Sequence, residues 1–291
     1  TLRIMDITFG TGELFAIISA ATWGVGAVVY GFINKDISPT KVVFLSSITA
    51  LTLQILFILL FGDISKLYIT DFKILAVIGF TAIVGNLLGG ILFMRAIRLV
   101  GVSVVSPITS TSPVFTLVLA IFFFNDVITP LLVLGTLAVV GGVILLTFQK
   151  NEGKSNIRDF RIGILFALII GITWGIAPVL LKYAVTYVDI FYVNGVRLML
   201  QVPILFVMLI LQKDLLSSFK IKTRDAVSIS IGGGLAYFVT VMFYLASLER
   251  ISVSIATPLS SIYPLFSFIL AVMFLKENFS YPKLIGTIVI V

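Results

Sequence analysis

The chain has 291 residues, of which 59% are hydrophobic and only 11% are charged, and its formal net charge is +7. A soluble domain carries about 25% charged residues, so a chain with this few is expected to face lipid over most of its surface. It contains no histidine and no cysteine, which excludes disulfides and removes the commonest general base and metal ligand. We therefore expect no cofactor and no metal site.

Ten apolar runs predict membrane-spanning helices, each of which needs about 20 mostly apolar residues. In chain order they lie near residues 13–33, 42–61, 72–98, 102–124, 130–149, 161–183, 190–211, 226–248, 252–275 and from 281 onward. The last run has eleven residues, or about 17 Å of helix, which is too short for a hydrocarbon core of about 30 Å. We expect this helix to continue beyond the sequence. The polar stretch 149–161 is the expected linker between two halves.

The chain matches itself when it is shifted by 151 residues, so that Thr-Trp-Gly at 22–24 aligns with Thr-Trp-Gly at 173–175. Further matched pairs are Gly12 and Gly163, Pro107 and Pro258, Ser110 and Ser261, Pro113 and Pro264, and Gly135 and Gly286. This self-similarity predicts a duplicated unit. We expect an all-α integral membrane protein with ten transmembrane helices, built from a five-helix repeat over 1–150 and a second over 151–291 whose last helix is truncated.

Five helices per repeat is an odd number, so the second repeat must enter the membrane upside down relative to the first. Two inverted repeats that exchange slightly different shapes would open a central cavity first to one side and then to the other. The parity therefore predicts alternating access. Loop charges give an orientation: five basic residues lie on the side of the N-terminus and fourteen on the other. The positive-inside rule then places both termini outside the cell.

The fourth and ninth runs carry hydroxyl groups next to prolines, in both halves. Ser106 and Ser110 accompany Pro107, and Thr257 and Ser261 accompany Pro258. A proline frees backbone carbonyls within a helix, and neighbouring hydroxyls or water must satisfy them. These faces are interpreted as lining a cavity; the alternative is that small polar residues only let the helices pack closely. The recurrence of proline with hydroxyls in both halves favours the cavity.

The seventh run holds Asn194, Arg197 and Gln201 on one helical face. An arginine inside a membrane span costs about 2.5–3.5 kcal/mol at the centre and needs a reason. Either Arg197 contacts the substrate at the cavity wall, or it is a structural anchor paired with helix ends or with a carboxylate such as Asp189. The sequence leaves both readings open.

Other polar and aromatic side chains are predicted deep in their helices. Asn86 lies in the middle of the third run, and its repeat counterpart is Tyr237; a buried amide or phenol needs a partner, so both are expected to face inward. Trp23 and Trp174 lie well inside their helices and are read either as cavity walls or as packing contacts. No helix interior holds a central acid, so proton coupling would depend on Glu13 alone.

In this order and in duplicate, the motifs resemble the drug/metabolite transporter superfamily, in its ten-helix branch with two EamA-type repeats. The residues that carry the resemblance are Trp-Gly at 23–24 and 174–175, Lys182, Arg197, Pro107, Pro258 and the acid-x-x-hydroxyl runs that begin at Asp126 and Glu277. The likeness covers the whole chain. It departs where Gly31 stands opposite Lys182 and Ser46 stands opposite Arg197, so the two halves are not equivalent.

The resemblance implies a small-solute carrier with a central cavity, and it places both termini in the cytoplasm, against the loop charges. We expect an alternating-access transporter of small polar metabolites, such as amino acids or related compounds, working as an exporter. The alternatives are a channel, or a transporter of cationic drugs, choline or phosphorylated sugars. An enzyme is not expected. The expected partners are a small-molecule substrate and the lipid bilayer of the plasma membrane, without nucleic acid, and the expected oligomeric state is monomer or homodimer.

The substrate-contacting residues predicted from these patterns come from both halves. They are Trp23, Asn86, Ser106, Ser110, Trp174, Asn194, Arg197, Tyr237, Thr257 and Ser261.

Overall fold

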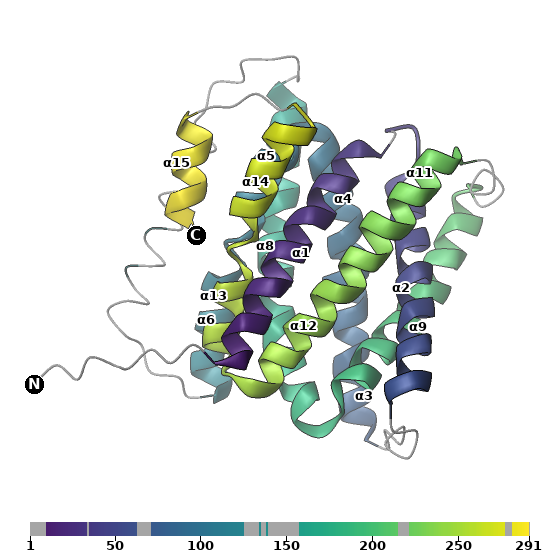
Figure 1. Ribbon diagram of the computed structural model, residues 1–291, viewed down its shortest axis with the longest axis vertical. Helices are drawn as coiled ribbons and strands as arrows, with labels where there is room; N and C mark the ends of the chain where they lie inside the picture. Colours follow the sequence, from purple (N-terminus) through teal and green to yellow (C-terminus); the bar gives the residue numbers. More distant parts are fainter. Residues whose placement is uncertain are drawn as a thin grey trace, which may run out of the picture.

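The computed structural model describes residues 10–33, 35–62, 71–124, 157–214, 221–276 and 281–290, together with positions 134 and 138. Across these residues the chain is helical and contains no strand (Figure 1). The predicted fifth helix, apart from positions 134 and 138, and the acids Asp126 and Glu277 lie outside the described residues.

Eight helical spans in the described part are long and apolar enough to cross a membrane. In the first half they are α1 (Thr11–Phe32), α2 (Pro39–Phe61), α3 with η2 and α4 (Phe72–Phe80, Thr81–Leu88, Gly89–Val100), and α5 with α6 (Val102–Thr109, Ser112–Phe124). In the second half they are α8 (Ile157–Tyr187), α9 (Ile190–Leu211), α11 with η3 and α12 (Thr223–Val227, Ser228–Leu235, Ala236–Arg250), and α13 with α14 (Val253–Ser260, Tyr263–Phe274). A further helix, α15, covers Tyr281–Ile290.

The outer surface of these helices carries large apolar side chains. Leu60, Phe122 and Leu211 are 72%, 77% and 76% exposed. Contiguous apolar surface of this kind is unfavourable in water and is expected where lipid covers it. The composition therefore gives the correct class of fold, an all-α membrane protein.

Helices α2 and α8 are among those that begin earlier than the apolar pattern predicts. Helix α2 starts at Pro39 because the Ser38 hydroxyl accepts the Lys41 N–H at 3.3 Å and proline occupies the first turn. Helix α8 starts at Ile157, so the last residues of the predicted linker 149–161 are helical. Its first turn contains Asp159, whose charge suits a helix N-terminus. Hydropathy misses these polar first turns because they extend beyond the apolar run.

The two halves pack against each other through reciprocal helix crossings. Helix α1 packs against α12 and α14, and α8 packs against the corresponding helices of the first half, α4 and α6. A Cβ atom added to Gly24 in α1 would lie 2.6 Å from Phe266 Cβ, and one added to Gly175 in α8 would lie 2.4 Å from Phe115 Cβ. Gly24 and Gly175 are 151 residues apart, and so are Phe115 and Phe266, so the two contacts are related by the repeat. Glycine thus sets the same close approach twice.

The helix starts show how the halves are oriented. A Cβ on Gly12, at the start of α1, would lie 2.6 Å from Ile251, which follows α12; a Cβ on Gly163, near the start of α8, would lie 2.6 Å from Val100 at the end of α4. Three spans separate Gly12 from Val100, so these two residues lie at opposite ends of the molecule. Helices α1 and α8 therefore begin at opposite ends, which is the pattern expected of an inverted arrangement.

Four of the spans are interrupted near the middle of the molecule. The predicted fourth and ninth helices each divide in two, at Ser110–Thr111 and at Ser261–Ile262. The third and eighth spans contain the π-helical segments η2 and η3, which the sequence pattern does not predict. A π-turn takes up an extra residue and is frequently found at functional sites.

Candidate functional site

A cavity of about 180 Å³ lies between the two halves, at the depth of the helix interruptions. It is lined by α1, α2, η2, α4 and α6 of the first half and by α8, α9, α12, α13 and α14 of the second. The lining residues include Ser19, Trp23, Ser47, Asn86, Phe93, Trp174, Arg197, Gln201, Tyr237, Thr240, Tyr244, Thr257, Ser261 and Tyr263.

Aromatic rings form one wall of the cavity around Trp23. Its ring centroid lies 5.2 Å from that of Trp174, 5.7 Å from Phe93, and 6.3 Å from both Tyr237 and Tyr263. The two indoles meet almost edge to face, at 76°, which is a favoured aromatic geometry. Trp23 and Trp174 are repeat counterparts, so the predicted cavity-wall placement of both holds in this structure.

Trp174 is fixed by the interrupted third span. Its Nε1–H donates to the Gly85 carbonyl at 2.8 Å, within η2. The indole also leaves no room for a side chain on Gly89, where an added Cβ would lie 2.5 Å from Nε1. The π-helical segment η2 therefore provides the acceptor, and Gly89 at the start of α4 provides the space, that hold this ring at the cavity.

Arg197 reaches the cavity from α9 and is only 3% exposed. Its Nη2 donates to Asn86 Oδ1 at 2.5 Å. Its Nε and Nη1 are buried and have no hydrogen-bond partner in the described part of the chain, and neither has Asn86 Nδ2. Among the described residues that line the cavity, Arg197 carries the single formal charge. The site is therefore a positively charged pocket with unused hydrogen-bond donors.

The polar face of α9 divides between two neighbours. Asn194 Nδ2 donates to Gln54 Oε1 of α2 at 2.8 Å, so Asn194 joins α9 to α2 and is not among the cavity-lining residues. Gln201, one turn beyond Arg197, does line the cavity, and its Nε2 donates to Ser47 Oγ at 2.8 Å. Asn194 therefore occupies a structural position, which its spacing alone did not reveal.

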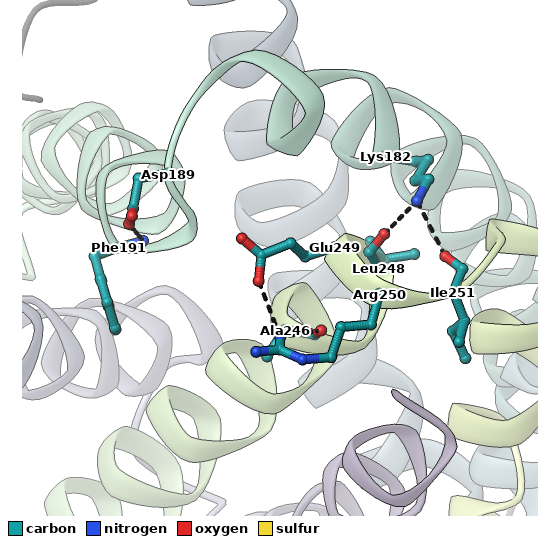
Figure 2. Close-up of polar contacts among 8 residues, drawn as sticks. All are labelled: Lys182, Asp189, Phe191, Ala246, Leu248, Glu249, Arg250 and Ile251. Atoms are coloured by element: carbon teal, nitrogen blue, oxygen red, sulfur yellow. Dashed lines mark hydrogen bonds and ion pairs between the residues drawn. The ribbon is translucent and has the colours of Figure 1, made fainter. Parts of the chain in front are cut away.

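The suggested pairing of Arg197 with Asp189 is wrong. The Asp189 carboxylate caps its own helix, where it accepts the Phe191 N–H at 2.9 Å (Figure 2). A short polar residue directly before a helix favours the cap over a distant cation.

Figure 2 also shows Lys182, whose ammonium donates to the carbonyls of Leu248 at 2.5 Å and Ile251 at 3.0 Å.

The hydroxyls of the fourth and ninth helices have two different roles. Thr257 and Ser261 line the cavity, and Thr257 Oγ1 lies 2.9 Å from the Tyr244 hydroxyl. Ser110 Oγ donates to the Ser261 carbonyl at 2.9 Å, and the Ser106 carbonyl accepts the Tyr263 hydroxyl at 3.0 Å. The Ser110 hydroxyl and the Ser106 backbone carbonyl therefore join the halves, and neither residue is among those that line the cavity.

The structure brings together seven of the ten predicted residues at the cavity, and leaves Ser106, Ser110 and Asn194 outside its lining. It adds Ser19, Thr240 and Tyr263, which the sequence reasoning missed. Ser19 Oγ donates to the Thr240 carbonyl at 3.0 Å. A signal existed for Thr240, because Tyr237, Thr240 and Tyr244 share one helical face.

The model of the EamA-like transporter family matches the chain twice, over residues 10–148 and 161–291. The chain belongs to the EamA-like transporter family. It is also 23% identical to an uncharacterized transporter of Archaeoglobus fulgidus over 279 residues, which is 96% of this chain and 94% of the relative. A protein of known crystal structure matches 97% of this chain and 93% of its own with a TM-score of 0.71 and 18% identity; that likeness shows the fold alone.

Family membership fixes the broad function of this EamA-like transporter. It is a multi-pass membrane protein that transports a small-molecule substrate, and it is not an enzyme. The eight apolar spans agree with this placement. The resemblance drawn from the duplicated Trp-Gly and proline motifs is confirmed.

Proposed function

We propose that this EamA-like transporter exports small polar metabolites, such as amino acids or related compounds, by alternating access. The observation that carries the proposal is the cavity of about 180 Å³ at the joint between two halves whose contacts are reciprocal. A site at such a joint changes its exposure whenever the halves tilt against each other. The transported solute would bind there and be released on the other side.

We further propose that residues 1–150 and 151–291 form two inverted five-helix repeats. The support is the opposite starting ends of α1 and α8 and the matched crossings at Gly24 and Gly175. In an inverted pair the two halves can exchange conformations, and the resulting state has similar packing but opens to the other side of the membrane. Inversion thus gives two states of similar stability.

The lining chemistry argues against two of the alternative substrates. Cationic drugs and choline would meet a cavity whose one charged lining group among the described residues, Arg197, is itself positive. Phosphorylated sugars would bring close to two negative charges to a single guanidinium. Small solutes with at most one net negative charge fit the cavity best.

Transport into proteoliposomes tests the proposal directly. Vesicles holding the purified chain and an excess of unlabelled amino acids should transiently accumulate the labelled compounds above equilibrium, and initial rates should saturate with concentration. Flux that is linear in concentration and shows no counterflow would identify a channel and overturn the proposal. Vesicles without protein provide the baseline.

A matched pair of variants connects that flux to the cavity. Gly90 lines the cavity, and a Cβ there would make ordinary contact with Val43 at 3.5 Å, so the Gly90→Leu side chain starts without a clash and is expected to occupy cavity space. Gly79 has similar room, 3.4 Å from Leu200, but lies outside the lining. Gly90→Leu should reduce the saturable rate at least about tenfold, which is about 1.4 kcal/mol, while Gly79→Leu should leave it within about twofold.

A further inference from the structure

We infer that Arg197 and Asn86 form a subsite for the carboxylate of the substrate, and that the transported compounds are small monocarboxylates with an apolar or aromatic body. The inference rests on the proposed function and narrows its substrate class. Three observations carry it: the unused donors of Arg197, the absence of an acid in the described lining, and the adjacent aromatic wall.

The guanidinium of Arg197 is incompletely paired. Nε and Nη1 bear three of its five N–H groups, and neither atom has a partner within the described residues. The Asn86 amide nitrogen, also a donor, is likewise buried and unpaired there. A buried charge without its hydrogen bonds is strongly unfavourable. An acceptor group that enters the cavity would make these missing hydrogen bonds, which would favour its binding.

The counter-charge to Arg197 does not come from the described lining of the cavity, which contains no acid. Asp189, the acid nearest in sequence, caps α9. Glu13 lies in the first turn of α1, ten residues or about 15 Å of helix from Trp23. Among the described residues that line the cavity, the neutralising charge is therefore left to the ligand.

A carboxylate fits this subsite better than other anions. The planar guanidinium matches two carboxylate oxygens, and one positive charge balances one negative charge. Asn86, which already accepts from Nη2, could donate through Nδ2 to the same ligand. A phosphate monoester would leave excess negative charge in the cavity, and an ammonium group would find no acid among the described lining residues.

The aromatic wall indicates the rest of the molecule. Trp174 is held by Gly85, the residue next to Asn86, so the rings begin directly beside the guanidinium. Phe93 and Trp23 extend this apolar surface, with Phe93 5.3 Å from Trp174. A ligand anchored by its carboxylate would therefore place an apolar body against the rings, where burial of apolar surface adds to binding.

Tryptophan fluorescence gives a direct reading of binding, because the chain has two tryptophans and both line the cavity. The purified full chain in detergent is titrated with cyclohexylacetate, cyclohexylacetamide and cyclohexylethylamine, which share one body and differ in charge. Cyclohexylacetate should bind at least about tenfold more tightly than the amide, as expected for hydrogen bonds to a charged group. The amine should bind most weakly.

Variants test whether Arg197 causes that preference. Arg197→Gln should remove the preference for carboxylate over amide, and Arg197→Lys should retain part of it. Asn86→Asp brings a carboxylate to the guanidinium from within the protein, so it should raise the unfolding temperature while it lowers cyclohexylacetate affinity at least about tenfold. A purely structural arginine would not produce that opposite pair of effects. Arg250→Gln, on an exposed arginine outside the cavity lining, is the control and should bind as the unaltered protein does.

Equal binding of acid and amide, a preference that survives Arg197→Gln, or no fluorescence response to any of the three compounds would each overturn the inference. The unaltered protein decides the first and third outcomes, so a variant that fails to fold does not block the test. Saturable counterflow of neutral or cationic solutes with no carboxylate preference would overturn the subsite and leave the transport mechanism standing. Carboxylate binding together with non-saturating flux would overturn the transport mechanism and leave the subsite standing.

Discussion

The glycines that pack the two halves together are the same in both, whereas the polar positions Asn86 and Arg197 that face the cavity have different residues as their repeat counterparts. Gly24 and Gly175 make the same close approach to Phe266 and Phe115. In contrast, Asn86 stands opposite Tyr237, and the counterpart of Arg197 is Ser46, whose hydroxyl donates to the Ile229 carbonyl. Packing is therefore set by the duplication, and the polarity of the cavity comes from the residues that break it.

The joints between the third and fourth spans show a second difference. In the first half the joint is Gly101, whose φ of 86° is a left-handed conformation that favours glycine. In the second half the matching residue is Ser252, with φ of −64°, and Lys182 binds the carbonyls beside the joint. The same turn is thus stabilised by backbone conformation in one half and by a charged side chain in the other.

Breaking the matched packing should have the largest effect. Gly175→Leu and Gly24→Leu each force a side chain into space already occupied by Phe115 or Phe266, and each should lower the free energy of unfolding by about 3 kcal/mol or more. Denaturant titration in detergent measures the loss. Gly79→Ala, with 3.4 Å to its nearest neighbour atom, is the control and should not destabilise. A large loss at one position without the other would contradict the equivalence of the two crossings.

Altering the two joints should have a smaller effect and sharpen the contrast between them. Lys182→Met removes both hydrogen bonds from the ammonium and should cost about 2 kcal/mol. Gly101→Ala forces a side chain into a backbone conformation, φ 86° and ψ 162°, that is essentially restricted to glycine, and should cost about 1 kcal/mol or more. Thermal unfolding of each variant checks the order. If Lys182→Met is neutral, the lysine does not stabilise its joint.

The smallest effect is expected at the surface beside that joint. Glu249 and Arg250 form an ion pair at 2.9 Å, but their side chains are 45% and 42% exposed (Figure 2). Exposed pairs contribute less than about 1 kcal/mol, so Glu249→Gln should hardly change the unfolding midpoint. A loss as large as that of Lys182→Met would show that the pair is part of the joint.

Much of the fold was predictable because hydropathy and self-similarity are properties of the sequence itself. The runs that became α1, α9 and α14 needed only apolar length, and the shift of 151 residues placed the joint between the halves. The π-helical segments η2 and η3 were not predictable in this way. Their register is set by partners distant in sequence, such as the indole of Trp174 that binds the Gly85 carbonyl.

The site was predictable to the extent that polarity inside a membrane span is unusual. Asn86, Arg197 and Tyr237 were found because each is costly to bury. The sequence could not tell which neighbour each helix face meets: Asn194 and Gln201 share a face with Arg197, yet one bonds to Gln54 outside the cavity and the other lines it. Spacing along one helix shows which residues share a face, but only the tertiary contacts show which neighbouring residue each of them meets.

The contact between Trp23 and Trp174 has a consequence for how a solute would cross. In the proposed inverted arrangement, a residue that touches its own repeat counterpart lies close to the axis that relates the halves, and the contact between Ser110 and Ser261 would lie there too. If the two halves exchange conformations, groups away from this axis change their surroundings, whereas groups on the axis keep the same neighbours. A bound solute would then contact the same two indoles whether it entered from one side of the membrane or the other. Only the off-axis guanidinium of Arg197 would have different surroundings in the two states.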